Sequence, residues 1–158
     1  MKVIASLLVL QLLLAAFGLF PFSGEKIADL QPVQVLTVQQ LPGAVLLRTD
    51  NGLSGYGADY AEAMERLEKT APGKAFFACC SAVVLCGGEE SLSAVVQDAR
   101  LRPAAAVYRA PFAPDAAQLQ PVLAAHPGGV RIADLQRGGE SLPQLIPLEE
   151  GWLVEDGA

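Results

Sequence analysis

A long apolar segment with one strongly polar residue, Gln11, opens the chain. Residues Val3 to Phe20 carry no charge, Lys2 precedes them and Pro21 follows them. At about 1.5 Å per residue, a helix of this length would extend roughly 27 Å, close to the hydrocarbon thickness of a bilayer. We therefore expect residues 1–23 to form a signal peptide or a membrane anchor. Because the segment has no polar face, a buried core helix is the lesser alternative.

The two export alternatives differ in what remains of this segment. A cleaved signal would have its hydrophobic region at Val3–Ala15 and a poor A-x-A site at residues 16–18. An anchor would span the membrane through residues 3–20, and Lys2 on the short side predicts an N-in orientation. Both alternatives place residues 24–158 at the outer face of the cytoplasmic membrane or in the secreted fraction. No Cys directly follows the apolar segment, so we expect no lipoprotein attachment site there.

The pattern after residue 24 begins with strand signals. Pro32–Gln40 is rich in β-branched residues, and Ala44–Thr49 follows a Leu-Pro-Gly turn, so these two segments predict a β-hairpin. Asp50–Gly57 contains closely spaced glycines and predicts a loop.

A helix is predicted to start at Asp59, whose spacing to Glu62 is that of a capping box. Apolar residues at helical spacing predict its buried face, which comprises Tyr60, Ala63, Met64, Leu67 and Ala71. Acid-first pairs four residues apart support its outer face, namely Glu62 with Arg66 and Glu65 with Lys69. Pro72-Gly73 ends it.

The central part of the chain is the most apolar after the N-terminal segment. Ala75–Cys86 is apolar except for Ser81, which favours a strand buried on both faces, although periodicity cannot decide between strand and helix. We expect its large side chains to lie in the core: Phe76, Phe77, Val83, Val84 and Leu85. Glu89–Leu101 predicts a second helix, with Glu89 and Glu90 in its first turn and Arg100 and Arg102 at its end. The apolar stripe of this helix comprises Leu92, Val95, Val96 and Ala99.

The remaining elements are shorter. Ala104–Ala110 predicts a strand, Asp115–Ala125 a helix divided into two pieces by Pro121, and Arg131–Gln136 a short helix. Leu145–Leu148 and Trp152–Glu155 predict a second hairpin. Together the order predicts an α/β (α+β) fold, a single domain with a mixed sheet and helices packed on it.

Composition and charge exclude several functions. The 158 residues carry a net charge of −6, which argues against a nucleic-acid surface because phosphate binding needs clustered Lys and Arg. Three Cys and one His argue against a disulfide scaffold or a zinc site made by protein ligands.

No motif predicts catalysis. The glycine-rich stretch around Ser54 fits neither a dinucleotide fingerprint nor a P-loop, and Tyr56 breaks the G-x-S-x-G pattern, so a small hydrolase using Ser54 is a remote alternative. On a straight strand Cys79 and Cys80 face opposite sides, whereas Cys80 and Cys86 share a face but lie roughly 20 Å apart. We expect all three thiols to act as small hydrophobes. His126 is expected at a helix end and the Glu149-Glu150 pair in a solvated turn, so no catalytic, cofactor-binding or metal residue is predicted.

The segments of residues 25–158 resemble, in order, the N-terminal domain of spore germination receptor C-subunits, the Ger(x)C family. The residues that carry the resemblance are Glu25–Leu30 before Val33–Val38, then Gly57, Ala63 and Leu67, then Phe76-Phe77 and Val83–Leu85, then Glu89–Ala99, Arg102, Leu142-Pro143 and Gly157-Ala158. The chain departs from the family at Gln39, where an Asp is frequent, and at Cys79, where a His is common. Members of the family are lipoproteins with further domains.

The resemblance implies a membrane-associated domain connected with spore germination or sporulation, and it supplies no catalytic residue. We therefore expect a non-enzymatic protein-interaction domain with an unknown protein partner. An extracytoplasmic small-ligand-binding module or a degenerate enzyme fold is the alternative. An interaction domain should expose an apolar patch or an open sheet edge, whereas a ligand module should enclose an apolar pocket with convergent polar groups.

Overall fold

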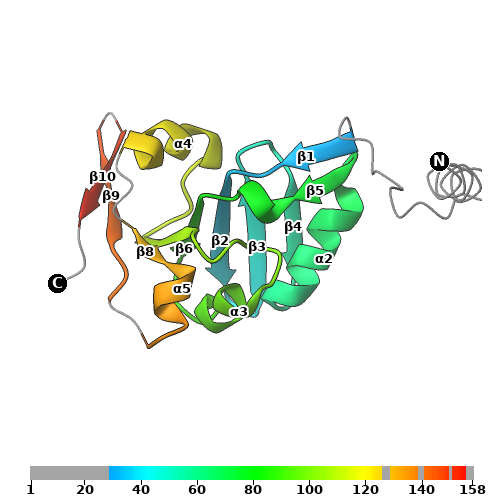
Figure 1. Ribbon diagram of the computed structural model, residues 1–158, viewed down its shortest axis with the longest axis horizontal. Helices are drawn as coiled ribbons and strands as arrows, with labels where there is room; N and C mark the ends of the chain where they lie inside the picture. The colour runs from blue at the N-terminus through cyan, green and yellow to red at the C-terminus, as the bar shows by residue number, and fades with distance from the viewer. Residues whose placement is uncertain (1–28, 126–128, 139–140, 150, 156–158) are drawn as a thin grey trace, which may run out of the picture.

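The fold is a mixed α/β domain, seen in a computed structural model that describes residues 29–125, 129–138, 141–149 and 151–155 (Figure 1). The main sheet contains β2 (Val35–Leu41), β3 (Ala44–Thr49), β4 (Ser54–Gly57), β6 (Ala82–Cys86), β7 (Ala106–Ala110), β8 (Val130–Arg131), β9 (Gln144–Leu148) and β10 (Gly151–Glu155). A separate parallel pair is formed by β1 (Leu30–Pro32) and β5 (Lys74–Phe76). The helices in the described residues are α2 (Tyr60–Thr70), α3 (Leu92–Gln97), α4 (Ala116–Ala125) and α5 (Ile132–Leu135), and a 3-10 turn, η2, covers Phe77–Cys79.

The main sheet is mixed, as the sequence predicted. Its strand order is β10-β9-β7-β6-β2-β3-β4, and β8 pairs with β7. The four strands β2, β6, β7 and β9 run parallel, while β3, β4, β8 and β10 are antiparallel to their neighbours. The carboxyl ends of β6 and β7 therefore meet at the same edge of the sheet, the edge at which ligands bind in open α/β sheets.

Helices cover both faces of this sheet. In β6, Val83 and Leu85 belong to one buried cluster, whereas Val84 and Cys86 belong to the other, because successive strand residues point to opposite faces. The first cluster includes buried residues of α2, α3 and α5, and the second includes buried residues of α4.

Two hairpins and the first helix are confirmed. Leu41 pairs with Ala44 across the first turn, and Leu148 pairs with Gly151 across the second. Asp59 caps α2 by accepting the backbone N–H of Glu62 at 2.8 Å. Both acid-first ion pairs form on the outer face, with N–O distances of 2.6 Å. The predicted inner face is also confirmed, except that its last residue, Ala71, is only half-buried.

The prediction of a single strand over Ala75–Cys86 is wrong. The chain pairs with β1 as β5, turns through η2, and joins β2 and β7 as β6. The turn buries Phe77 at 3% exposure and leaves Phe76 at 38%, so the expectation of a buried Phe76 is also wrong. A continuously apolar run has no periodicity to mark such a break, which explains the error.

The second helix is shorter than the predicted Glu89–Leu101. It covers Leu92–Gln97, so Glu89, Glu90, Arg100 and Arg102 lie outside it. It ends at Asp98, where the backbone is extended and the carboxylate accepts the backbone N–H of Arg100 at 3.0 Å. A short acidic side chain that bonds the local backbone competes with helix continuation. In the predicted stripe, Val95 is buried, Leu92 and Val96 are half-buried, and Ala99 is exposed.

Three further boundaries differ from the predictions. Pro32–Gln40 is divided between β1 and β2, and Ser54–Gly57 of the predicted loop forms β4. Glycine is depleted in strands, which hid β4. The region predicted as two helical pieces forms one helix, Ala116–Ala125, despite Pro121, because Leu119 and Leu123 on either side pack into the same cluster.

Candidate functional site

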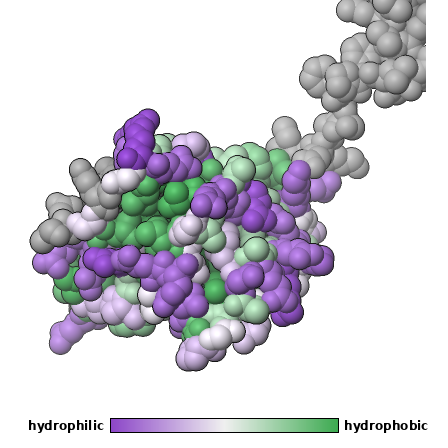
Figure 2. All heavy atoms as spheres, turned by 90° about the horizontal axis from the view of Figure 1, so that it is seen from below, coloured by the Kyte–Doolittle hydropathy of each residue, from purple (hydrophilic) through white to green (hydrophobic). Residues whose placement is uncertain are grey.

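A groove of about 810 Å³ opens at the carboxyl ends of β6 and β7. Its lining comes from the segment before α3, from α3, from β7, from the end of α5 and from described residues between α5 and β9. The lining residues are Glu89, Glu90, Leu92, Ser93, Val96, Gln97, Arg109, Leu135, Gly138, Ser141 and Leu142. Viewed from below the orientation of Figure 1, where α3 and α5 lie, apolar side chains gather in a hollow framed by polar ones (Figure 2).

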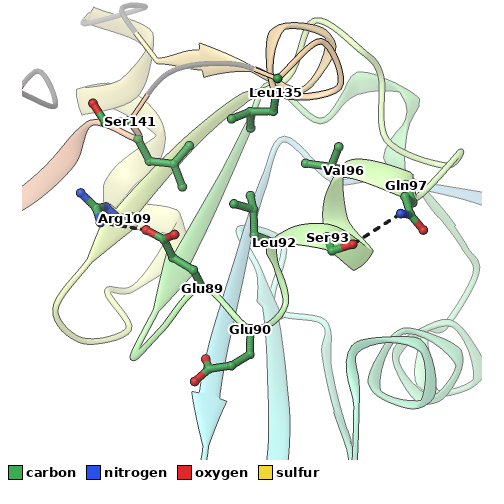
Figure 3. A pocket seen from close by; sticks show the side chains of 11 residues that line it. Glu89, Glu90, Leu92, Ser93, Val96, Gln97, Arg109, Leu135 and Ser141 are labelled. Atoms are coloured by element: carbon green, nitrogen blue, oxygen red, sulfur yellow. Dashed lines mark hydrogen bonds and ion pairs between the residues drawn. The ribbon is translucent and has the colours of Figure 1, made fainter.

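The floor of the groove is apolar. Leu92 and Val96 lie four residues apart on α3 and therefore share one side of that helix. Leu135 of α5 faces them across the groove (Figure 3). Leu142, which precedes β9, is 3% exposed and joins the core beneath them. The side-chain amide of Gln136 donates to the carbonyl of Val96 at 2.8 Å, which ties α5 to α3.

One end of the groove is charged. Nη1 of Arg109 lies 2.8 Å from Oε1 of Glu89, and the two side chains point toward each other (Figure 3). The backbone N–H of Arg109 donates to the carbonyl of Pro143 at 2.9 Å, which fixes this part of β7 beside the chain leading into β9. Among the described residues, Nε of Arg109 is buried without a hydrogen-bond partner, and Glu90 forms no ion pair. The charged end therefore keeps one hydrogen-bond donor and one carboxylate for a bound group.

The sequence did not indicate this groove. Leu92 and Val96 were assigned to a core stripe, and Glu89 and Glu90 to the first turn of a helix. The i, i+4 spacing of Leu92 and Val96 was a correct signal for a shared side of α3. It could not distinguish a buried side from a groove floor, because that depends on how closely α5 approaches.

Ser54 is exposed on β4 at the other end of the sheet. It lies beside a hollow of about 370 Å³ that Arg48 and Asp115 also line. A Ser-His-Asp arrangement would need a histidine, and the lone His126 lies outside the described residues. The described residues thus give Ser54 no activating base.

The three cysteines are separate free thiols. Burial raises the pKa of Cys80 to about 12 and that of Cys86 to about 12, so both stay protonated near neutral pH. The expectation that Cys80 and Cys86 share a face is wrong, because η2 interrupts the strand and each belongs to a different buried cluster. Cys79 is half-buried and its thiol lies 3.3 Å from the carbonyl of Val33.

The described part of the chain contains no group of three His, Cys, Asp or Glu side chains arranged to hold a metal. Glu149 lies in an exposed turn, and Glu150 is outside the described residues. None of the described helices is both long and apolar enough to cross a bilayer, and the predicted signal or anchor at 1–23 lies outside them.

Comparison with known proteins adds no relative: no family model, no curated protein and no solved structure matches the chain.

Proposed function

We propose that the protein is a non-enzymatic interaction domain, exported or anchored through residues 3–20, that binds a protein partner at the outer face of the cytoplasmic membrane. The observation that carries the proposal is the groove beside α3, which is open and has an apolar floor. Partner-binding surfaces typically combine an apolar centre with a polar rim. The resemblance to the Ger(x)C family supports a role in spore germination or sporulation.

The charges at the groove favour a particular kind of partner segment. The Arg109–Glu89 pair is internally neutral, and no cation among the described residues pairs with the carboxylate of Glu90 at the rim. A segment with apolar side chains for Leu92 and Val96 and a basic side chain for Glu90 would match this arrangement. Charge complementarity of this kind contributes mainly to specificity and association rate.

A small-ligand-binding module is the second candidate. The observation that favours it is Nε of Arg109, which is buried and has no hydrogen-bond partner in the part of the chain that the structure describes. It lies at the carboxyl end of a parallel strand, where ligands bind in open α/β sheets. A ligand with an acceptor group would satisfy this donor. An Arg109→Lys variant that loses ligand-induced thermal stabilisation but retains the partner interaction would favour this candidate.

Export is tested by fusing alkaline phosphatase to the C-terminus of the full chain. We expect an active fusion, because the enzyme functions only outside the cytoplasm. An inactive fusion whose domain is protected from protease in spheroplasts would overturn both the export and the membrane location.

The interaction is tested by complementation in a spore-forming host that lacks the gene. We expect the deletion to impair germination, the wild-type gene to restore it, and Glu90→Lys to fail. Gln118→Lys, an exposed position on α4 across the sheet, is the matched control and should restore it. Circular dichroism verifies that both variants fold. Normal germination of the deletion strain would reject the germination role, and full complementation by Glu90→Lys would reject the groove.

The non-enzymatic assignment has its own test in the same host. Ser54→Ala, Cys79→Ser and His126→Ala should each complement fully, because none of these side chains is needed for chemistry. A folded Ser54→Ala or His126→Ala protein that fails to complement would instead indicate catalysis.

A further inference from the structure

The two edge strands of the main sheet differ in how far the rest of the chain satisfies their backbone groups. At the β4 end, side chains of α2 bind the strand's carbonyls: Arg66 donates to the carbonyl of Tyr56 at 3.0 Å, and Thr70 donates to that of Ser54 at 3.2 Å. At the other end, no strand within the described residues pairs with the outer side of β10 (Figure 1). An open strand edge is a template for pairing with another chain.

Strand β10 also lacks the features that protect exposed edges. Its sequence, Gly151–Glu155, contains no Lys and no Pro, and Glu155 is its one charged residue. Leu153 is 48% exposed, and Leu148 beside it on β9 is 56% exposed. On the opposite face, Phe112 is 52% exposed and contacts the ring of Trp152, with 5.2 Å between centroids. Both faces of this edge are therefore apolar.

The pairing of β10 with β9 indicates which backbone groups point outward. Trp152 lies opposite Pro147, which has no N–H, so this is a pair whose backbone groups point away from each other. Leu153, opposite Ile146, is then a hydrogen-bonded pair, and Val154 points outward like Trp152. The free edge thus offers the N–H and C=O groups of Trp152 and Val154.

We propose that β10 pairs antiparallel with β10 of a second copy of this chain, about a two-fold axis at Leu153. In this register Trp152 lies opposite Val154 of the partner subunit, so the outward groups of the two strands meet as hydrogen-bonded pairs. Leu153 meets Leu153 of the partner subunit as a non-hydrogen-bonded pair, in which the side chains approach most closely. The two sheets become continuous.

Charge and length select this register over its neighbours. It is the one in which all five residues of β10 are paired, and it places Glu155 opposite Gly151 of the partner subunit. A register centred on Glu155 would bring two carboxylates together, which is destabilising. If the two-fold axis moved by half a residue, Trp152 would lie opposite Leu153 of the partner subunit. The backbone N–H and C=O of Leu153 point toward β9, so the hydrogen bonds between the two copies would be lost.

This proposal goes beyond the proposed interaction function, because it assigns a second contact to a different part of the molecule. It uses the sheet edge and not the groove beside α3. The two proposals can therefore be rejected separately. A monomeric protein would reject self-association without affecting the groove, and full complementation by Glu90→Lys would reject the groove without affecting self-association.

The test is disulfide cross-linking of the protein in the cells that produce it, with the membrane and secreted fractions both analysed. In a Cys79→Ser background, Leu153→Cys should give a dimer on a non-reducing gel after mild copper-phenanthroline oxidation. Leu148→Cys is the matched control, because Leu148 is similarly exposed on the neighbouring strand. It would lie at least three strand spacings, more than about 14 Å, from its symmetry mate. Two Cα atoms more than about 7 Å apart cannot form a disulfide without backbone movement. We expect at least a tenfold larger dimer fraction for Leu153→Cys than for the control.

A second measurement is needed because oxidation can also cross-link two copies that collide without forming a stable dimer. Val154→Pro removes an outward N–H without touching the pairs that hold β10 on β9. Sedimentation equilibrium of the full chain in detergent should show a wild-type dimer and a Val154→Pro monomer with unchanged circular dichroism. Equal cross-linking at Leu153→Cys and Leu148→Cys, a monomeric wild type, or cross-linking of Leu153→Cys only to a different protein would each overturn self-pairing.

Discussion

At the scale of single residues, Asp98 lies at the centre of a polar network between Tyr60 and Arg100. Its carboxylate accepts from the hydroxyl of Tyr60 at 2.9 Å and from Nε and Nη2 of Arg100 at 2.8 and 2.9 Å. Burial acts to raise the pKa of Asp98, but the hydrogen bonds from Arg100 and Tyr60 outweigh it and hold the pKa below its usual range. Burial and the neighbouring carboxylate raise the pKa of Tyr60. The network ties α2 to the chain after α3.

Asp98→Asn should lower the free energy of unfolding by about 1–3 kcal/mol at neutral pH, because it removes the charge on which the hydrogen bonds depend. A carboxyl group with a depressed pKa in the folded state stabilises the fold above its unfolded pKa, near 3.9, and loses that contribution as pH falls through the folded value. The difference between wild type and Asp98→Asn, measured by urea unfolding, should therefore shrink below about pH 4. A difference that is constant from pH 7 to acid would contradict the role of the charge.

At the scale of elements, the turn between β5 and β6 determines which aromatic side chain enters the core. Phe76 and Phe77 are adjacent, yet Phe77 belongs to the buried cluster beneath α2 and Phe76 faces solvent. The hydrogen bond from the N–H of Cys80 to the carbonyl of Phe77, at 2.9 Å, closes the turn. The path of the backbone, rather than the hydrophobicity of the side chain, therefore determines which of the two residues is buried.

Phe77→Ala should destabilise the protein by about 3–5 kcal/mol, the range for truncating a buried Phe. Phe76→Ala is the matched control and should cost less, about 1–2 kcal/mol, because 38% of its surface already contacts water. Chemical denaturation followed by circular dichroism measures both. Similar losses for the two variants would mean that the turn does not distinguish them.

The packing of α2 on β4 depends on glycine. A Cβ atom at Gly55 would lie 2.0 Å from the carbonyl oxygen of Ala63 and 2.7 Å from Cβ of Leu67. These are atoms of the helix backbone and of the side-chain base, so they cannot swing aside. The helix can therefore approach the strand this closely only where the strand has no side chain.

Gly55→Ala should cost about 1–3 kcal/mol or more, because α2 must move away from the sheet. Ser54→Ala, one residue earlier on the same strand and exposed, should change the stability by no more than about 0.5 kcal/mol. Thermal unfolding of both variants tests this. An unchanged midpoint for Gly55→Ala would show that α2 is not held against β4.

At the scale of the whole molecule, stability is unevenly distributed across the sheet. β6 is covered on both faces, all five of its residues are buried, and it pairs with both β2 and β7. The β9–β10 hairpin joins β7 through a single backbone pair, Arg109 with Gln144, and otherwise depends on packing against α4. The sheet therefore has a well-supported centre and a weakly attached end.

Native-state hydrogen exchange should reflect this difference. The amides of Val83, Val84 and Leu85 are expected to exchange only through global unfolding, whereas those of the β9–β10 hairpin should exchange through local opening of lower free energy. Amide exchange followed by mass spectrometry of peptides from each region gives the comparison. Equal protection of the two regions would indicate that the hairpin unfolds only with the rest of the domain.

The sequence by itself determined the features that depend on neighbouring residues. The Leu-Pro-Gly turn predicted the first hairpin, although Leu41, which was expected in the turn, is the last residue of β2 and pairs with Ala44. The capping spacing predicted Asp59 as the residue that caps α2. The order of strand and helix signals also predicted a mixed sheet with packed helices. These features follow from backbone and side-chain preferences within a few residues, which a pattern can reveal.

Tertiary structure decided what depends on residues distant in sequence. The break at η2 exists because β5 pairs with β1 while β6 pairs with β2 and β7, and β4 exists because α2 returns over two glycines. The groove exists because α5 stops short of the floor formed by Leu92 and Val96. Hydrophobicity specifies that a side chain avoids water, but the approach of another element determines whether it is buried, lines a groove or remains at an edge.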